Sequence, residues 1–252
     1  MSLTRRHALT LLGASLASPS LATTVEEPPM PTIRIATEGA FPPYNSLDKN
    51  GNLQGFEVDL GKAICAARGL SVIWVITDWA TMIPDLLAGD FDVIMAGMAI
   101  TPSRARQIAF GTEYFPSDDG ATGMYVGAHT FQSPHGSLIA VQENTIHEDH
   151  LRTLGLRVET YATARKALDA VLDGAADITF GSPDYLEPLV YRTSRTLAIL
   201  GTEVIEAGGA AAGFRKQDTT LRNQFNTGLA QLRSDGTLKR LNAKWFADNR
   251  DI

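Results

Sequence analysis

The stretch that decides the fold is Ile33–Leu60, IRIATEGAFPPYNSLDKNGNLQGFEVDL. Its first residues alternate as a buried strand does, and they lead into a loop that carries Glu38 and Phe41. A turn at Asn50-Gly51 follows, and a helix is expected to begin near Gly55-Phe56. The order strand, loop, turn and helix predicts the first unit of an α/β fold.

A second informative segment is GMAITPSRARQIAF, residues 97–110, which places Arg104 just after a short apolar strand. The planar guanidinium group of arginine binds a carboxylate through two parallel charge-assisted hydrogen bonds. The preceding Thr101-Pro102-Ser103 suits a helix N-terminus, whose free N–H groups favour anions. A surface arginine, like its neighbour Arg106, is the alternative interpretation.

Helix and strand patterns alternate along the rest of the chain, which predicts an α/β fold with mainly parallel sheets. Two polar, glycine-containing segments, 117–123 and 201–209, are predicted to cross between two halves of the molecule. The expected strands are 33–36, 72–76, 93–95, 124–126, 138–141, 178–180, 198–200 and 211–214. The expected helices are 57–68, 82–87, 164–172, 221–234 and 238–246.

These two motifs, in this order and at this spacing, resemble the periplasmic solute-binding proteins that bind amino acids, especially cationic amino acids and opines. The resemblance implies a two-lobed periplasmic-binding-protein fold, with a hinge and a ligand cleft between the lobes. It places a discontinuous first lobe at 31–118 plus 207–250 and a continuous second lobe at 119–206. Two crossings between compact lobes make a hinge that closes over the cleft.

The resemblance assigns Arg104 to the ligand's α-carboxylate, and Phe41 and Trp79 to two aromatic walls around the ligand's side chain. Flat aromatic faces favour an aliphatic or cationic chain between them. Glu38 corresponds to an acidic residue at the far polar end of the ligand, which favours a cationic side chain. As isolated residues, the two aromatic rings would more often belong to a core, and Glu38 is also consistent with a solvated loop carboxylate.

Further ligand contacts follow from the same resemblance. Gly97, Met98 and Ala99 correspond to a segment that binds the ligand through its backbone, where some relatives add serine hydroxyl groups. Thr145 corresponds to a threonine of the second lobe that bonds the ligand's carboxylate. The same residue also suits the N-cap of the following helix, and both roles can hold together.

Ser182 departs from the family pattern, because its relatives carry an aspartate there that pairs with the ligand's α-ammonium group. A buried positive charge without that partner is costly. Three explanations remain open: Asp184 takes over the role, the ligand's amine is secondary or absent, or affinity for ordinary amino acids is lost.

Composition excludes several other classes of function. The formal net charge is −6 and the sequence holds no basic stripe, which argues against nucleic-acid binding. Arg5 and Arg6, an apolar run at 8–17 and the small residues of 20–22 predict a signal peptide, cleaved after residue 22 and followed by a flexible linker, 23–30. The arginine pair suggests the twin-arginine route to the periplasm.

The single cysteine, Cys65, cannot form an intramolecular disulfide and is expected to be a small core residue. The five histidines lack the spacing of metal ligands, and His147 and His150 are expected at an exposed helix start. No phosphate-binding loop, dinucleotide fingerprint or nucleophile elbow is present, so we expect neither a metal nor a cofactor.

The family points to the substrate-binding component of an ABC amino-acid uptake system, a monomer that docks on an inner-membrane permease. An enzyme is the main alternative, because cyclohexadienyl dehydratases share this fold; its general acid would come from Glu38, Glu143 or Asp184. A sensor that reports the ligand to a membrane partner is the third possibility.

Overall fold

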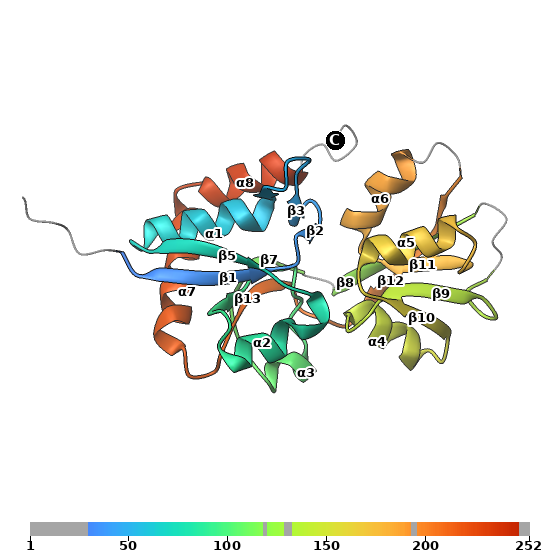
Figure 1. The fold of residues 1–252 in the computed structure, drawn as a ribbon, viewed down its shortest axis with the longest axis horizontal. Helices are drawn as coiled ribbons and strands as arrows, with labels where there is room; N and C mark the ends of the chain where they lie inside the picture. Colours follow the sequence, from blue (N-terminus) through green and yellow to red (C-terminus); the bar gives the residue numbers. More distant parts are fainter. Residues whose placement is uncertain (1–29, 118–119, 129–132, 193–195, 247–252) are drawn as a thin grey trace, which may run out of the picture.

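The computed structural model describes residues 30–117, 120–128, 133–192 and 196–246. Two five-stranded sheets organise these residues into two lobes that lie side by side (Figure 1). The expected signal peptide, 1–22, and the linker 23–30 apart from Met30 lie outside the described residues. None of the described helices is both long and apolar enough to cross a bilayer.

The first lobe is built on a sheet with the strand order β5-β1-β6-β13-β7. β1 pairs in parallel with β5 and β6, whereas β13 runs antiparallel to both β6 and β7. The strands are β1 (Thr32–Thr37), β5 (Ser71–Ile76), β6 (Val93–Ile94), β7 (Ala109–Phe115) and β13 (Ala210–Phe214). The end of the chain therefore returns to the sheet that the beginning of the chain started.

Helices cover both faces of this sheet (Figure 1). α1, α7 and α8 pack together on one face and bury an apolar cluster that includes Phe56, Leu60 and Phe214, each fully buried. Cys65 belongs to this cluster at 1% exposure, which confirms its predicted place in the core. The helices of this lobe are α1 (Phe56–Ala67), α2 (Met82–Ala88), α3 (Pro102–Ala105), α7 (Thr219–Ser234) and α8 (Thr237–Phe246).

The second lobe is built on a sheet with the order β10-β9-β11-β8-β12. Its strands are β8 (Ala121–Gly127), β9 (Leu138–Gln142), β10 (Arg157–Tyr161), β11 (Ile178–Gly181) and β12 (Ala198–Ile205). Its helices are α4 (Ile146–Thr153), α5 (Ala164–Leu172) and α6 (Pro183–Arg192). The sheet's central residues, such as Ile139, Val141 and Ile178, are completely buried.

Short elements of the first lobe lie where β1 and β5 end. A small antiparallel sheet follows β1 and consists of β2 (Ala40–Phe41), β3 (Asn45–Leu47) and β4 (Leu53–Gln54). One turn of 3₁₀ helix, η1 (Trp79–Thr81), follows β5. Because β1 and β5 are parallel, their following loops lie at the same end of the sheet.

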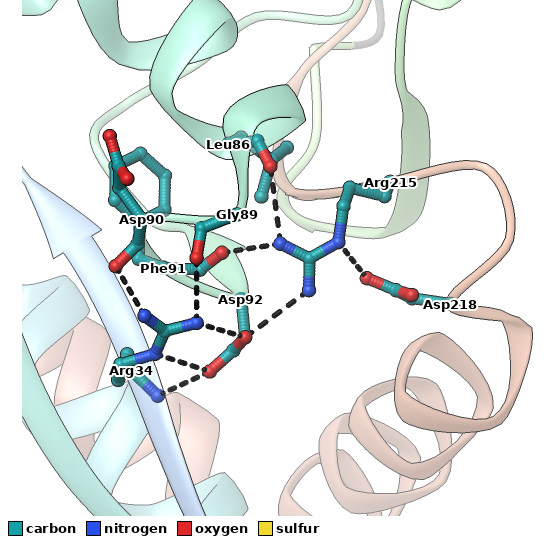
Figure 2. Close-up of polar contacts among 8 residues, drawn as sticks. All are labelled: Arg34, Leu86, Gly89, Asp90, Phe91, Asp92, Arg215 and Asp218. Atoms are coloured by element: carbon teal, nitrogen blue, oxygen red, sulfur yellow. Dashed lines mark hydrogen bonds and ion pairs between the residues drawn. The ribbon is translucent and has the colours of Figure 1, made fainter.

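A network of ion pairs joins β1, the segment before β6 and the segment after β13, away from these loops (Figure 2). Arg34 in β1 approaches Asp92 with Nη2 2.9 Å from Oδ1 and Nε 3.1 Å from Oδ2. Arg215, just after β13, reaches the same carboxylate at 3.2 Å and Asp218 at 2.7 Å. Burial alone raises the Asp92 pKa, but the hydrogen bonds from Arg34 and Arg215 outweigh this and lower it.

The structure corrects three expectations about the elements. The sheets are not mainly parallel: among the described strands, four of the eight pairings in the two large sheets are antiparallel. β12 continues past Gly201 to Ile205, so the return crossing is shorter than 201–209. β8 begins at Ala121, inside the expected first crossing. Both crossings carry β-strand residues because β8 and β12 pair over their whole length.

Candidate ligand-binding cleft

A cavity of about 550 Å³ lies between the two lobes. Both lobes contribute residues to its wall, and so do the two crossings, for example with Ser117 and Gly208. Eight of the nine predicted ligand contacts line this cavity or adjoin it through their backbone; they are Glu38, Phe41, Trp79, Gly97, Ala99, Arg104, Thr145 and Ser182. A cavity of this size between two domains is a typical site for a small molecule.

Arg104 lies on α3, whose N-cap is Thr101, as the sequence predicts: the Thr101 hydroxyl accepts from the Arg104 N–H at 3.2 Å. The guanidinium group donates to the Ala99 carbonyl at 2.9 Å and to the Asn144 carbonyl at 3.1 Å. Within the described residues, no carboxylate lies within 4.0 Å of it. Burial lowers the Arg104 pKa to about 10, and the group stays charged at neutral pH.

The side chains of Trp79 and Arg104 contact each other at the cleft and share one hydrogen-bond acceptor. The Arg104 guanidinium carbon lies 5.1 Å from the centroid of the Trp79 ring, within cation–π range. The indole N–H donates at 3.2 Å to the Asn144 carbonyl, which also accepts from Arg104. Asn144 belongs to the second lobe and has a positive φ of 56°, a conformation that asparagine tolerates better than most residues. Two side chains of the first lobe therefore meet one backbone oxygen of the second.

Phe41 lines the cavity as one ring of an aromatic stack. Its ring stacks on Tyr44 at 5.4 Å and on Tyr185 of the second lobe at 5.6 Å between centroids. The ring also lies close to Gly97, where a Cβ atom would lie 3.2 Å from it. Gly97 also has a positive φ of 63°, so both conformation and close approach favour glycine here.

Glu38 follows β1 and lines the cavity, where its carboxylate accepts from the Gln142 amide at 2.7 Å across the cleft. Desolvation is the main reason that its pKa is raised to about 7, with a smaller contribution from Asp78. A carboxylate in such an environment gains most from a cationic partner, which would restore its charged form.

Met98 is not among the residues that line the cavity, and its backbone contact with a ligand stays a prediction. Its side chain is 1% exposed and packs in the apolar core around α2, and its carbonyl accepts from the Ala211 N–H at 3.2 Å. Gly97 and Ala99, its neighbours, line the cavity. The chain bends at Gly97, whose φ is 63°, and the Met98 side chain that follows points into the core.

Glu57 holds two cleft segments from behind and was not predicted to do so. This fully buried carboxylate accepts from the Gly97 N–H at 2.6 Å and from the Asn45 amide at 2.8 Å. Asn45 in turn accepts from the N–H of Gly39, next to Glu38, at 2.8 Å. Tyr114 also donates to Glu57, whose pKa is raised because burial outweighs these hydrogen bonds. The signal in the sequence was an acidic residue on the apolar start of the first long helix.

Thr145 is the N-cap of α4, as one of its two interpretations predicts. Its hydroxyl accepts from the Glu148 N–H at 3.2 Å and donates to the Gln142 carbonyl at 2.8 Å. The one proton of this hydroxyl is therefore used inside the protein. The residue lines the cavity mainly as part of the turn that presents the Asn144 carbonyl.

Ser182 lies immediately before α6, and its carbonyl accepts from the N–H groups of Tyr185 and Leu186. Both Ser182 and Asp184 line the cavity. The Asp184 carboxylate accepts from the Tyr44 hydroxyl of the first lobe at 2.8 Å, and burial raises its pKa. An acid is thus present two residues from the position where the family places one.

His147 is a correction, because it is not at an exposed helix start. It lines the cavity, and its buried Nε2 atom has no hydrogen-bond partner among the residues that the structure describes. Burial lowers its pKa to about 4, so the ring is neutral at pH 7. His150, three residues on, lies 2.5 Å from the Glu203 carboxylate. Within the described residues, no cluster of histidine, cysteine and acidic side chains has the arrangement of a metal site.

Comparison with known families gives one clear match. The family profile described as "Bacterial extracellular solute-binding proteins, family 3" matches residues 33–248. This range includes both large sheets and every residue named above for the cleft.

Individual relatives agree with this family. A lysine/arginine/ornithine-binding periplasmic protein of Escherichia coli K12 is 30% identical, and the alignment covers 95% of each chain. A putative ABC transporter arginine-binding protein 2 of the same organism is 29% identical over 94% of this chain and 98% of its own. The crystal structure of a periplasmic His/Glu/Gln/Arg/opine family-binding protein from Silicibacter pomeroyi, in complex with lysine, is 35% identical with a TM-score of 0.80, covering 87% of this chain and 99% of that one.

Proposed function

The chain belongs to family 3 of the bacterial extracellular solute-binding proteins, and we propose that it delivers a cationic amino acid, or an N-substituted derivative of one, to an ABC permease. The relatives named above are periplasmic amino-acid-binding proteins. The observation that carries the proposal is Arg104, a buried guanidinium group in an inter-lobe cavity with no described carboxylate within 4.0 Å. A ligand carboxylate is the natural counter-charge for such a group.

The proposed mechanism is closure of the two lobes over the ligand. Contacts across the cleft already join Glu38 to Gln142 and Tyr44 to Asp184. Because a ligand shifts a conformational equilibrium only through different affinity for its two states, it must contact both lobes. We propose the lobe boundaries 31–118 plus 207–250 and 119–206, with the hinge at the crossings.

The proposed ligand contacts divide by chemistry. Arg104 binds the α-carboxylate, the Phe41 and Trp79 rings line the aliphatic part of the ligand, and Glu38 attracts its distal cation. Gly97 and Ala99 contribute backbone, and Thr145 positions the turn across the cleft. Export is proposed to use the predicted signal peptide, and the closed form is proposed to dock as a monomer.

A thermal-shift screen of the purified mature protein tests the ligand class. The panel holds amino acids, opines, polyamines and keto acids, and each hit is measured by calorimetry. A ligand at a hundred times its dissociation constant stabilises the protein by about 2.7 kcal/mol, well within detection. We expect hits among arginine, lysine, ornithine and opines made from them. A response confined to neutral or acidic amino acids would contradict the role of Glu38.

The same preparation decides between binding and catalysis. Incubation with prephenate or arogenate is expected to leave both compounds unchanged. Turnover of either would instead identify a cyclohexadienyl dehydratase. Small-angle scattering with and without a confirmed ligand is expected to show compaction, and an unchanged profile would contradict lobe closure.

A further inference from the structure

A continuous chain of hydrogen bonds joins two segments of the first lobe that line the cavity. The loop after β1 carries Glu38, and the segment after β6 carries Gly97. The side-chain oxygen of Asn45 accepts from the Gly39 N–H at 2.8 Å, and its amide nitrogen donates to Glu57 at 2.8 Å. The Glu57 carboxylate also accepts from the Gly97 N–H at 2.6 Å. Two side chains therefore span the whole distance between the two segments.

The two middle members of this chain are held firmly. Asn45 and Glu57 are both completely buried. The Glu57 backbone N–H donates to the Tyr44 carbonyl at 2.9 Å, so the first turn of α1 lies directly against the start of β3. Gly55 makes this approach possible, because a Cβ atom there would lie 2.2 Å from the Tyr44 oxygen. The part of the fold between the two cavity segments therefore has little freedom to move.

Neither Asn45 nor Glu57 belongs to the cavity wall. In the part of the chain that the structure describes, no lysine, arginine or histidine nitrogen lies within 4.0 Å of the Glu57 carboxylate. Its third partner is the hydroxyl of Tyr114, which donates to it. A buried carboxylate needs such donors, and two of the three hold the cavity segments. The arrangement suits a residue that positions the site without contacting a ligand.

We propose that Glu57 and Asn45 are positioning residues that fix the separation of the two segments, and thereby the length of the ligand that the cavity selects. The inference rests on the proposed function, in which Glu38 attracts the distal cation and Arg104 binds the α-carboxylate. Neither positioning residue is part of that ligand contact set.

The two ends of the ligand then lie near opposite ends of this hydrogen-bond chain. Glu38 is the neighbour of Gly39, and Arg104 donates at 2.9 Å to the carbonyl of Ala99, two residues after Gly97. A change in the separation of the segments therefore changes the distance between the two charged subsites. One methylene group in a well-packed site is worth roughly 10- to 200-fold in discrimination, so a fixed separation gives strong selectivity for length.

Calorimetry with three diamino acids of increasing length tests the proposal. L-ornithine, L-lysine and L-homolysine differ by one methylene group each and carry the same charges. The wild type is expected to separate its best from its worst ligand by at least about tenfold. Glu57→Gln and Asn45→Ala are expected to reduce this ratio to about threefold or less. A ratio of affinities does not depend on the folded fraction, so a merely structural loss would leave it unchanged.

Glu57→Gln breaks the chain through hydrogen-bond polarity. An amide has one acceptor oxygen, whereas a carboxylate has two. With its oxygen toward the Gly97 N–H, the introduced glutamine directs its NH₂ group at the NH₂ group of Asn45. If Asn45 rotates to accept instead, its own NH₂ group meets the Gly39 N–H. One link is lost in either case.

A double variant restores the chain. Asn45→Asp in the Glu57→Gln background supplies a carboxylate that accepts both from the Gly39 N–H and from the introduced glutamine. The oxygen of that glutamine is then free to accept from the Gly97 N–H. The ratio between the best and worst ligand is expected to return to within about twofold of the wild-type value. A ratio that stays at about threefold or less in the double variant would contradict the proposal.

Tyr114→Phe is the matched control, because it removes one hydrogen bond to the same carboxylate and leaves both links to the cavity segments intact. It is expected to lower the melting temperature and to keep the ratio within about twofold of wild type. A ratio reduced as strongly as in Glu57→Gln would mean that loss of stability alone causes the effect. Asn45→Ala keeps Glu57 bound to Gly97, so it tests the chain even if Glu57→Gln does not fold.

Three further results would overturn the inference. They are a wild type that separates the three probes by less than about tenfold, an unchanged ratio in Glu57→Gln, and an unchanged ratio in Asn45→Ala. If the wild type binds none of the three, the inference is also wrong, and the wider thermal-shift panel decides whether the proposed function fails with it. If it binds them, the variants test this inference alone.

Discussion

The first lobe contains two arginine sites that differ in what surrounds them. Arg34 and Arg215 share Asp92, and every one of their charged contacts lies at 3.2 Å or less (Figure 2). Arg104 is more deeply buried, at 8% exposure, and within the described parts of the chain its guanidinium group contacts two carbonyl oxygens and the Trp79 ring. The paired arginines neutralise charge within the fold, whereas Arg104 keeps its charge available to a ligand.

The difference follows from the cost of desolvation. Burial lowers the Arg104 pKa to about 10, because water is removed and the charge of Asp149 offsets this loss only in part. At Asp92 the balance is reversed, since two guanidinium groups outweigh burial and lower the carboxyl pKa. Functional sites often retain such uncompensated charge at the expense of stability.

The strongest test of this contrast is Arg104→Ala. We expect it to weaken L-arginine binding at least about thirtyfold, because truncating one member of a buried charge pair costs about 2–5 kcal/mol. Its melting temperature without ligand is expected to equal or exceed that of wild type. Arg104→Lys is also expected to bind poorly, since a single ammonium group cannot form the bidentate contact.

Calorimetry and a thermal melt of each variant measure these effects. Arg106→Ala, an exposed neighbour on the same segment, serves as the matched control. Wild-type affinity in either Arg104 variant would remove Arg104 from the ligand site.

The paired site is expected to respond in the opposite way. Asp92→Asn replaces a carboxylate that accepts from Arg34 and Arg215. The free energy of unfolding is expected to fall by about 1–3 kcal/mol, the usual contribution of hydrogen bonds to charged groups. Affinity for L-arginine is expected to change by less than about threefold, because Asp92, Arg34 and Arg215 do not line the cavity. A urea titration measures the free energy of unfolding, and calorimetry measures the affinity. A large loss of affinity would contradict a purely structural role for the Asp92 site.

Glu38 predicts a pH dependence of the ligand site. Its pKa is raised to about 7, so below that pH the carboxyl group is protonated and cannot pair with a cation. Affinity for L-arginine is therefore expected to rise with pH and to level off above about pH 8. The stability of the ligand-free protein has the opposite sign: the raised pKa favours the folded state at low pH, and this contribution is lost as pH rises through 7.

Glu38→Gln is expected to remove most of both dependences between pH 5.5 and 8. Calorimetry in buffers of different ionisation enthalpy would also show proton release on binding. An affinity that stays constant over this range would show that Glu38 remains charged in the free protein.

Ser182→Asp is expected to have the smallest effect on L-arginine affinity. The substitution adds a second acid immediately before α6, two residues from Asp184. If Asp184 already supplies the missing charge, L-arginine affinity is expected to rise by about threefold or less, because the two acids compete for one cation. A gain of a hundredfold would mean that Ser182 faces the α-amine and that Asp184 serves another role.

The sequence predicted most of the fold because its strands and helices have strong periodic patterns. It could not show that β8 and β12 pair antiparallel, since a short strand has the same alternation in either direction. In the cleft, Arg104 and Phe41 were recognisable by their motifs, and both line the cavity. The buried state of His147 was not recognisable, because only tertiary packing from α4 against the second sheet covers its ring.

Met98 and Glu57 also show that the sequence does not reveal which side chains of a segment are buried. The motif placed Met98 in the binding segment, but the backbone turns its side chain into the core. Glu57 is a charged residue of a type usually found on the exposed face of a helix. It is nevertheless completely buried, and its carboxylate accepts a hydrogen bond from the Gly97 N–H. Which face of a segment meets the ligand depends on packing between elements that are distant in sequence.

Trp79 gives the cleft an optical reporter of its own. The chain contains three tryptophans, and among the described residues Trp79 is the one whose ring lines the cavity. Its indole N–H bonds to the opposite lobe and its ring faces a guanidinium group, so opening the cleft would change both its hydration and its local electric field. The intrinsic fluorescence of the unlabelled protein should therefore follow lobe movement in real time, including the rates of opening and closing.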